Sequence, residues 1–116
     1  MRKIYYLKTC DTCKRILQSI PNLDSFELQD IKEQPITVKQ LEDMHSLSKS
    51  YEALFSKRAK LYKEMGLKDE KLSENDFKRY ILEHYTFLAR PVIIIDEQIF
   101  IGNSPKNLKA LAAFFN

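Results

Sequence analysis

The N-terminal part of the chain has an apolar pattern that predicts a strand, a helix and a second strand. Residues 3–7 are types that fit a pleated strand, and from Cys13 onward the apolar residues return every three or four positions. Pro21 ends this helical pattern. Phe26 and Leu28 then alternate with polar neighbours, which predicts a short strand parallel to the first. The segment is therefore expected to form a right-handed β-α-β unit.

The middle of the chain has the pattern of a series of helices. Thr37 with Gln40 resembles a capping box, Ser73 with Asp76 starts another helix, and Gly66 stands where a helix would end. Apolar residues at helical spacing are expected to form four buried faces: Val38, Leu41 and Met44; Tyr51, Leu54 and Phe55; Leu61, Tyr62 and Met65; and Phe77, Ile81, Tyr85 and Leu88.

The apolar period changes again after Pro91. The β-branched run 92–95 predicts a strand buried on both faces, and 98–101 predicts its hairpin partner, although the turn between them lacks glycine. Ser104 and Pro105 form an N-cap with proline at the first helical position. The last helix is expected to bury the face formed by Leu108, Leu111, Ala112 and Phe115.

This order of elements predicts an α/β protein with a four-stranded mixed sheet, built as β-α-β, a helical insertion and β-β-α. A chain of 116 residues is long enough for one core, so a single domain 1–116 is expected. Residues 1–35 and 88–116 would form the sheet-containing core, and residues 36–87 the helical insertion.

Composition adds few constraints. The net charge of +3 is modest and the lysines are interleaved with acids, so no direct contact with nucleic acid is expected. The apolar run before the cysteines is too short for a signal peptide, and no run approaches the length of a membrane span. A monomeric cytoplasmic protein with no membrane association is expected.

Cys10 and Cys13 lie where the first strand leads into the first helix. Unpaired backbone N–H groups and the helix dipole favour an anion there, and Lys14 and Arg15 add positive charge nearby, which Asp11 opposes. Cysteines at such sites have their pKa lowered from about 8.5 to roughly 3.5–7.5. Cys13, one turn further, is placed to resolve a disulfide formed at Cys10.

The cysteines and histidines have other interpretations. A cysteine is often only a small buried hydrophobe, and His45 and His84 could act as acid or base or could be packed or surface residues. A zinc site needs four ligands, and the histidines lie far from the cysteines in sequence, so no metal is expected. A Cys-x-x-Cys pair in a chain without a secretion signal favours reversible redox chemistry.

Three segments carry a resemblance to the arsenate reductase family and its Spx-like relatives: TCDTCK at 9–14, SKRAKLYKEMGL at 56–67 and RPVIIIDE at 90–97. The resemblance implies a thioredoxin-like fold in which Cys10 is the nucleophile. It implies that Arg58 and Arg90 face this cysteine. Arginine suits that task, because its forked donors bind an oxyanion or a thiolate and it stays charged.

The resemblance also concerns residues beside the nucleophile. It implies a cis peptide bond before Pro91, opposite the reactive cysteine, and puts Thr12 and Lys14 next to the site. Glutaredoxin-linked arsenate reductases have serine where this chain has Cys13 and histidine where it has Tyr6. Of their three arginine positions, the first reads Ser56, with Arg58 at the position used by Spx-like relatives, and the third falls at about Gly102. These departures favour a protein that cycles its own internal disulfide.

Two functions therefore follow as expectations. The first is a thiol-dependent oxidoreductase of the arsenate reductase type, in which Cys10 attacks an oxyanion or a disulfide and Cys13 resolves the product. It would need no metal or organic cofactor, because glutathione, glutaredoxin or thioredoxin would restore the dithiol. The second is an Spx-like regulator, in which the same pair senses redox state and the protein binds RNA polymerase. A folded relative with neither activity is a third interpretation.

Overall fold

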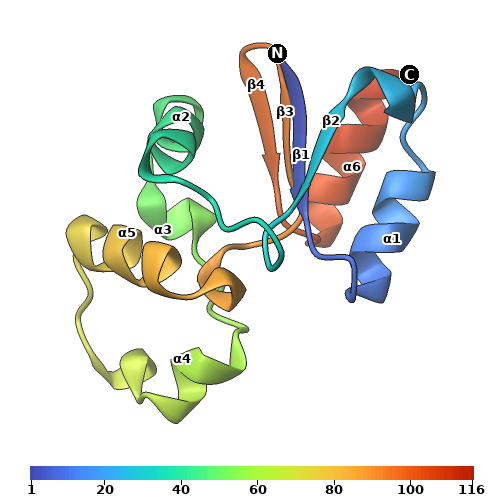
Figure 1. Cartoon of the computed structure of the whole chain (residues 1–116). Coiled ribbons are helices and arrows are strands. Elements are labelled where there is room, and N and C mark those ends of the chain that lie inside the picture. Colours follow the sequence, from blue (N-terminus) through green and yellow to red (C-terminus); the bar gives the residue numbers. More distant parts are fainter. The chain divides into compact units, whose positions relative to one another are not determined.

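A computed structural model describes all residues 1–116, and its elements follow the predicted order (Figure 1). The strands are β1 (Arg2–Tyr6), β2 (Glu27–Asp30), β3 (Val92–Ile95) and β4 (Gln98–Ile101). The α-helices are α1 (Asp11–Gln18), α2 (Val38–Ser48), α3 (Tyr51–Leu54), α4 (Lys60–Glu64), α5 (Glu74–Glu83) and α6 (Pro105–Phe115). Short 3₁₀ turns are η1 (Leu23–Ser25), η2 (Leu67–Asp69) and η3 (Tyr85–Phe87).

The four strands form one mixed sheet in the order β2-β1-β3-β4. β1 pairs with β2 in parallel, while β1 with β3 and β3 with β4 are antiparallel. The predicted hairpin is confirmed, and Asp96 takes the left-handed conformation, with φ 55°, that its turn needs in place of glycine. The predicted four-stranded mixed sheet is therefore confirmed.

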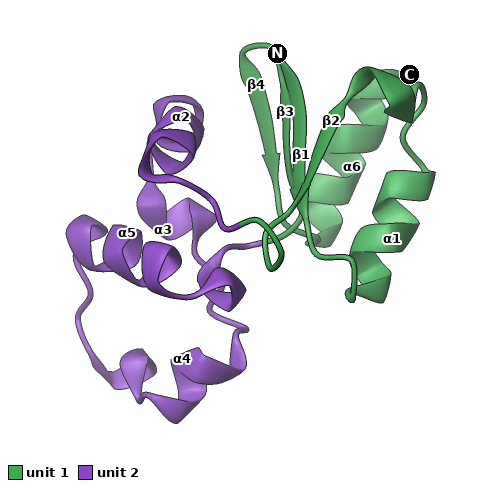
Figure 2. Ribbon diagram, viewed as in Figure 1, with its two compact units in different colours: residues 1–34, 90–116 green, residues 35–89 purple.

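The chain divides into two compact units, coloured in Figure 2. The first unit comprises residues 1–34 and 90–116 and holds the sheet with α1 and α6. The second unit comprises residues 35–89 and holds the remaining α-helices. The expected core and insertion had boundaries at residues 35 and 88, and their folding as a single domain stays a prediction.

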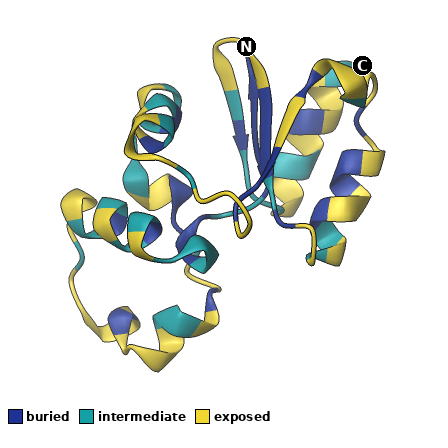
Figure 3. Cartoon of the chain, in the orientation of Figure 1, coloured by how far each residue is buried: buried dark blue, intermediate teal, exposed yellow.

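In the first unit, α1 and α6 cover one face of the sheet. Ile4, Ile93 and Phe100 point from the strands into a buried cluster with Leu17 of α1 and Leu111 of α6. β3 is buried at every position, as its β-branched run predicts (Figure 3). This burial fixes the register of the sheet, since a shift by one residue would turn the apolar set to the other face.

The register brings three connections of the first unit to one end of the sheet. Val92, at the start of β3, pairs with Tyr5 near the end of β1 and with Ile101 at the end of β4. The chain therefore leaves β1 toward Cys10 at the same end at which it enters β3 from Pro91.

In the second unit, the helices begin at defined caps and surround an aromatic cluster. Both capping boxes are formed, on Thr37 with Gln40 and on Ser73 with Asp76. The ring of Phe55 lies 4.9 Å from that of Phe77 and 5.1 Å from that of Phe87, measured between centroids. Gly66 follows α4 with φ +67°, as expected of a helix-ending glycine.

Several expected apolar faces are wrong in part. Val38 and Met65 are 52% and 48% exposed, and α4 buries none of its residues, because burial depends on which elements pack against a helix and not on apolar spacing alone. Ala112 of α6 is also exposed. Leu28 is 42% exposed while its neighbour Gln29 is buried, donating a 2.9 Å hydrogen bond to the Gln34 carbonyl.

The helix predicted through Leu88 ends earlier. α5 stops at Glu83, and His84 takes an extended conformation with φ −148°. The His84 side chain accepts a hydrogen bond from the Thr86 N–H and so caps η3. Leu88 is still buried, as expected, but on a connection that pairs with Phe55. None of the helices combines the length and the apolar character needed to cross a membrane.

Candidate active site

Cys10 is the N-cap residue of α1, held by a tight turn after β1. Its N–H donates to the Leu7 carbonyl at 3.0 Å, and its own carbonyl accepts the first helical hydrogen bond from Lys14 at 3.1 Å. The residue has the extended conformation of an N-cap, φ −95° and ψ 112°, and is partly exposed. The sulfur thus lies at the N-terminus of a helix, where backbone N–H groups lack helical partners.

The surroundings of Cys10 favour its thiolate. Partial burial raises the pKa of this thiol, but donors on the next turn more than offset that effect. They are the Cys13 N–H, the Cys13 thiol and the Thr12 N–H, and the charge of Arg90 adds to them. The pKa of Cys10 is therefore lowered, as predicted for a thiol at the N-terminus of a helix.

Cys13 has the opposite environment. Its side chain is fully buried on the inner face of α1, and this burial raises its pKa to about 11. The negative charge and the hydrogen bond of Cys10 act in the same direction, whereas the Leu7 backbone and Arg90 oppose them. Both cysteines are free thiols in this structure. The pair therefore consists of an accessible sulfur prone to ionise and a buried one that stays protonated.

Arg90 and Pro91 directly precede β3, and they lie at the end of the sheet at which the chain leaves β1 toward Cys10. The peptide bond between them is cis, as expected. The Pro91 carbonyl accepts from the Gly102 N–H at 2.8 Å, which ties this bond to the end of β4. Arg90 lies close enough for its charge to lower the pKa of both cysteines.

Two asparagines that sequence reasoning missed support this connection. Asn103 donates from its side chain to the Arg90 carbonyl at 3.4 Å, and Asn107 of α6 donates to the Gly102 carbonyl at 2.8 Å. The signal available in the sequence is the pair Gly102-Asn103, typical of a turn, just before the capped last helix. These side chains hold the backbone next to the candidate site.

The other expected residues are placed as follows. Thr12 contributes its N–H toward Cys10, and its hydroxyl accepts from Arg15 at 3.4 Å. Lys14 is exposed on α1. Arg58 belongs to the second unit, where it is exposed in the turn before α4. Its approach to Cys10 stays a prediction.

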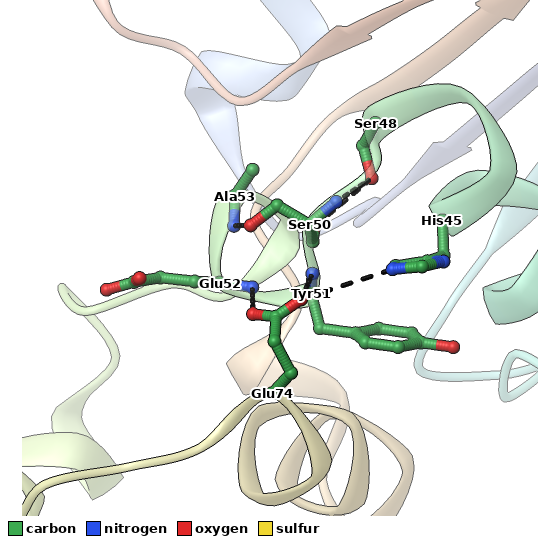
Figure 4. Close-up of polar contacts among 7 residues, drawn as sticks. All are labelled: His45, Ser48, Ser50, Tyr51, Glu52, Ala53 and Glu74. Carbon is green, nitrogen blue, oxygen red and sulfur yellow. Dashed lines mark hydrogen bonds and ion pairs between the residues drawn. The ribbon is translucent and has the colours of Figure 1, made fainter.

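The two histidines of the second unit have packing contacts. His45 stacks on Tyr51 with 4.0 Å between ring centroids, and its Nε2 lies 4.0 Å from Glu74, whose carboxylate caps α3 (Figure 4). The ring of His84 makes a 2.8 Å hydrogen bond with the Thr86 hydroxyl and stacks on Tyr85. No group of three or more His, Cys, Asp and Glu side chains is arranged to hold a metal ion.

This arrangement can be compared with known proteins. The model of the ArsC family matches residues 5–111. The chain belongs to the ArsC family. Among curated relatives, Global transcriptional regulator Spx 2 of Bacillus anthracis is 23% identical over 108 residues, which cover 91% of this chain and 82% of that protein.

Solved structures of the same family show the same fold. Arsenate reductase from Vibrio cholerae matches with a TM-score of 0.77 and 21% identity, covering 95% of this chain and 96% of that chain. An ArsC-related protein from Brucella melitensis matches with a TM-score of 0.68 and 18% identity, covering 94% and 92% of the two chains. The expected α/β, thioredoxin-like fold is thereby confirmed, and it is also the fold of the arsenate reductase from Vibrio cholerae.

Proposed function

We propose that the chain is a thiol-dependent oxidoreductase in which Cys10 is the nucleophile and Cys13 the resolving thiol. The observation that carries this proposal is the placement of the two sulfurs, with Cys10 partly exposed at the N-terminus of α1 and Cys13 fully buried one turn further. This placement lowers the pKa of Cys10 and raises that of Cys13 to about 11, so the more accessible sulfur ionises first and attacks first.

With a disulfide substrate, the Cys10 thiolate attacks one sulfur and expels the other as a thiolate, leaving a mixed disulfide. Cys13 then loses its proton and attacks the Cys10 sulfur, so the second substrate thiol leaves and a Cys10–Cys13 disulfide forms. With arsenate, Cys10 would displace water to form an S–As bond. Attack by Cys13 on the Cys10 sulfur would then leave the bonding pair on arsenic, which is reduced from As(V) to As(III).

Each cycle consumes two electrons, which an external dithiol or two thiols must supply. Glutathione, glutaredoxin or thioredoxin would fit, and no metal or organic cofactor takes part in the proposal. Arg90 would stabilise the negative charge of the thiolate and of an approaching oxyanion. Arg58 would do the same if it approaches the site.

The test is steady-state turnover of arsenate and of a small disulfide with each thiol donor. Cys10→Ser should lose at least about a hundredfold in rate, because the reacting atom is gone. Cys13→Ser should accumulate a mixed disulfide at Cys10, visible by mass spectrometry, because nothing resolves it. The two variants serve as controls for each other. No turnover by the wild type with any donor would contradict the proposal.

A second candidate is a redox-sensing regulator that binds RNA polymerase. It is favoured by the curated relatives, which are named as global transcriptional regulators and align with 91% of this chain. In this function the Cys10–Cys13 disulfide would be a switch and not a turnover intermediate. Affinity capture with purified RNA polymerase, under reducing and oxidising conditions, tests it. Failure to retain polymerase in both conditions would contradict it.

A further inference from the structure

A groove runs along the outer side of the first unit between α1 and α6. Its volume is ≈ 430 Å³, and its lining is mainly apolar, with Ile16 from α1, Ile20 from the turn after α1, and Leu108, Leu111 and Phe115 from α6. Along α6 the lining extends from Leu108 to Phe115, about 10 Å at 1.5 Å per residue. Neither the thiol chemistry nor the sheet requires such an opening on this side of the helices.

The second half of α6 has an apolar surface that the fold leaves uncovered. Residues 110–115 (Ala-Leu-Ala-Ala-Phe-Phe) contain no polar side chain, yet only Leu111 among them is buried. Phe114 is 36% exposed, and Figure 3 shows most of α6 outside the buried class. A helix that is apolar on all sides is normally covered on all sides. This surface adjoins the groove and is typical of an interaction site.

The charges around the groove favour an acidic partner. Arg15 lines it from α1 and is exposed, and Lys109, which follows the lining residue Leu108, is exposed on α6. α6 contains no Asp or Glu, and Asp11 is the only acid on α1. A second copy of this chain is disfavoured, because a two-fold interface would bring the same basic residues together.

We propose that this groove binds a short amphipathic helix of a partner protein, with its apolar side chains in the groove and Asp or Glu residues along its flanks. Helices bind such grooves through apolar anchors at spacings of three and four residues. About two turns of helix match this length of the groove. Arg15 and Lys109 would pair with the acidic flanks.

The groove begins next to the candidate active site. Thr12 lines the groove, and its N–H is one of the donors that lower the pKa of Cys10. A partner bound there would lie beside the reactive sulfur. The inference does not rest on the thiol chemistry, because it depends only on the shape, the apolar character and the charge of α1 and α6. A Cys10→Ser variant should therefore bind as the wild type does.

The test is selection from a displayed library of helical peptides of about 16 residues, with apolar positions and flanking charges varied, against the full chain. The matched variants are Ala112→Arg and Ala110→Arg, since both alanines are exposed on α6 but only Ala112 lines the groove. Selected peptides should carry acidic flanks. They should bind Ala112→Arg at least about tenfold more weakly and Ala110→Arg with unchanged affinity. Arg15→Glu should remove the preference for acidic flanks.

NMR spectra of the labelled chain should show amide shifts confined to α1 and α6 when a selected peptide is added. Peptides with basic flanks, equal weakening by both alanine variants, or no enrichment over Ala112→Arg would overturn the proposal. Dimerisation of the chain that Ala112→Arg abolishes would also overturn it, in favour of a second copy. Binding of dodecanoate in the groove, together with the selection of no peptide, would likewise overturn the proposal and would indicate that the groove binds a small amphiphile.

Discussion

The unit that carries the two cysteines is built on a sheet, whereas residues 35–89 have helices and a single isolated β-bridge. In the sheet unit, strands far apart in sequence are neighbours: Ile4 pairs with Ile93, and the packed cluster extends to Leu111. In the helical unit, most helices begin at a residue whose side chain caps the helix, and the partner of the cap lies only a few positions away. Ser73 and Asp76 form such a cap at the start of α5.

The difference explains where the candidate chemistry lies. Non-local pairing brings the end of β1, the start of β3 and the end of β4 to one place, so Cys10 can be near Arg90 although eighty positions separate them. Helices stabilised by local caps do not by themselves bring residues that are distant in sequence next to one another. In the second unit, the Glu74 carboxylate at the start of α5 contacts the start of α3, only about two dozen positions earlier in the sequence.

The sharpest test of the comparison is whether the two units unfold together. Ile93→Ala and Leu54→Ala each truncate a fully buried side chain, one in each unit. Each should lower the free energy of unfolding by about 2–5 kcal/mol, through lost burial and a residual cavity. If the chain is one domain, urea unfolding followed by circular dichroism should show one transition that shifts in both variants.

Leu28→Ala is the control for this test, because Leu28 is 42% exposed and should change stability by less than about 0.5 kcal/mol beyond propensity effects. Two separate transitions, each shifted by one variant only, would show that the units are independent domains.

The second test concerns the buried thiol. The pKa of Cys13 is raised from 9.0 to about 11 in the folded chain, so between these values the unfolded chain loses a proton that the folded chain keeps. The contribution of the Cys13 thiol to the free energy of unfolding should therefore be fully present below pH 9 and should fall by about 2 kcal/mol as the pH rises toward 11. Urea unfolding of wild type and Cys13→Ala should give stability curves that converge over this range. Parallel curves would contradict the raised pKa.

The third test removes the contact between Glu74 of α5 and the start of α3 in the helical unit. The Glu74 carboxylate accepts hydrogen bonds from the N–H groups of Tyr51 at 2.7 Å and Glu52 at 3.1 Å (Figure 4). Glu74→Ala should destabilise the chain by about 1–2 kcal/mol, because two donors at the start of α3 lose their acceptor. Glu70→Ala, at an exposed position in the same unit, is the matched control. Equal thermal unfolding of the two variants would contradict the role of Glu74.

The fourth test concerns a purely local cap. Thr37→Ala removes the acceptor of the 3.0 Å hydrogen bond from the Gln40 N–H and should cost about 1 kcal/mol. Val38→Ala, one residue further and 52% exposed, should change stability by less than about 0.5 kcal/mol. Chemical denaturation of both variants measures the difference. A loss of more than about 0.5 kcal/mol for Val38→Ala would mean that the Val38 side chain is buried against another part of the protein in solution.

The smallest expected effect is that of Arg90 on Cys10. The charge of Arg90 lowers the pKa of Cys10 less than the hydrogen bonds from the α1 turn do. Arg90→Met should therefore slow alkylation of Cys10 at pH 6 by only about threefold, since less thiolate is present. Arg79→Met, in the second unit, is the control and should leave the rate unchanged. An unchanged rate in Arg90→Met would place its charge outside the site.

Much of the fold could be predicted from the sequence because its signals are local. The β-branched run 92–95, the proline after Ser104 and the capping residues Thr37 and Ser73 each specify a short stretch of backbone, and each was confirmed. The errors came where burial depends on distant neighbours. Apolar spacing placed Val38 and Met65 on buried helix faces, but spacing does not say whether another element covers that side.

The candidate site divides in the same way. The sequence by itself determined that Cys10 lies at the N-terminus of a helix, because the strand, the turn and the amphipathic helix that set this position are contiguous. The tertiary structure alone decided that Cys13 is fully buried with a raised pKa, and that Asn103 and Asn107 hold the backbone beside Arg90. Those properties depend on which surfaces exclude water and which distant atoms meet, and both are consequences of packing across the sheet.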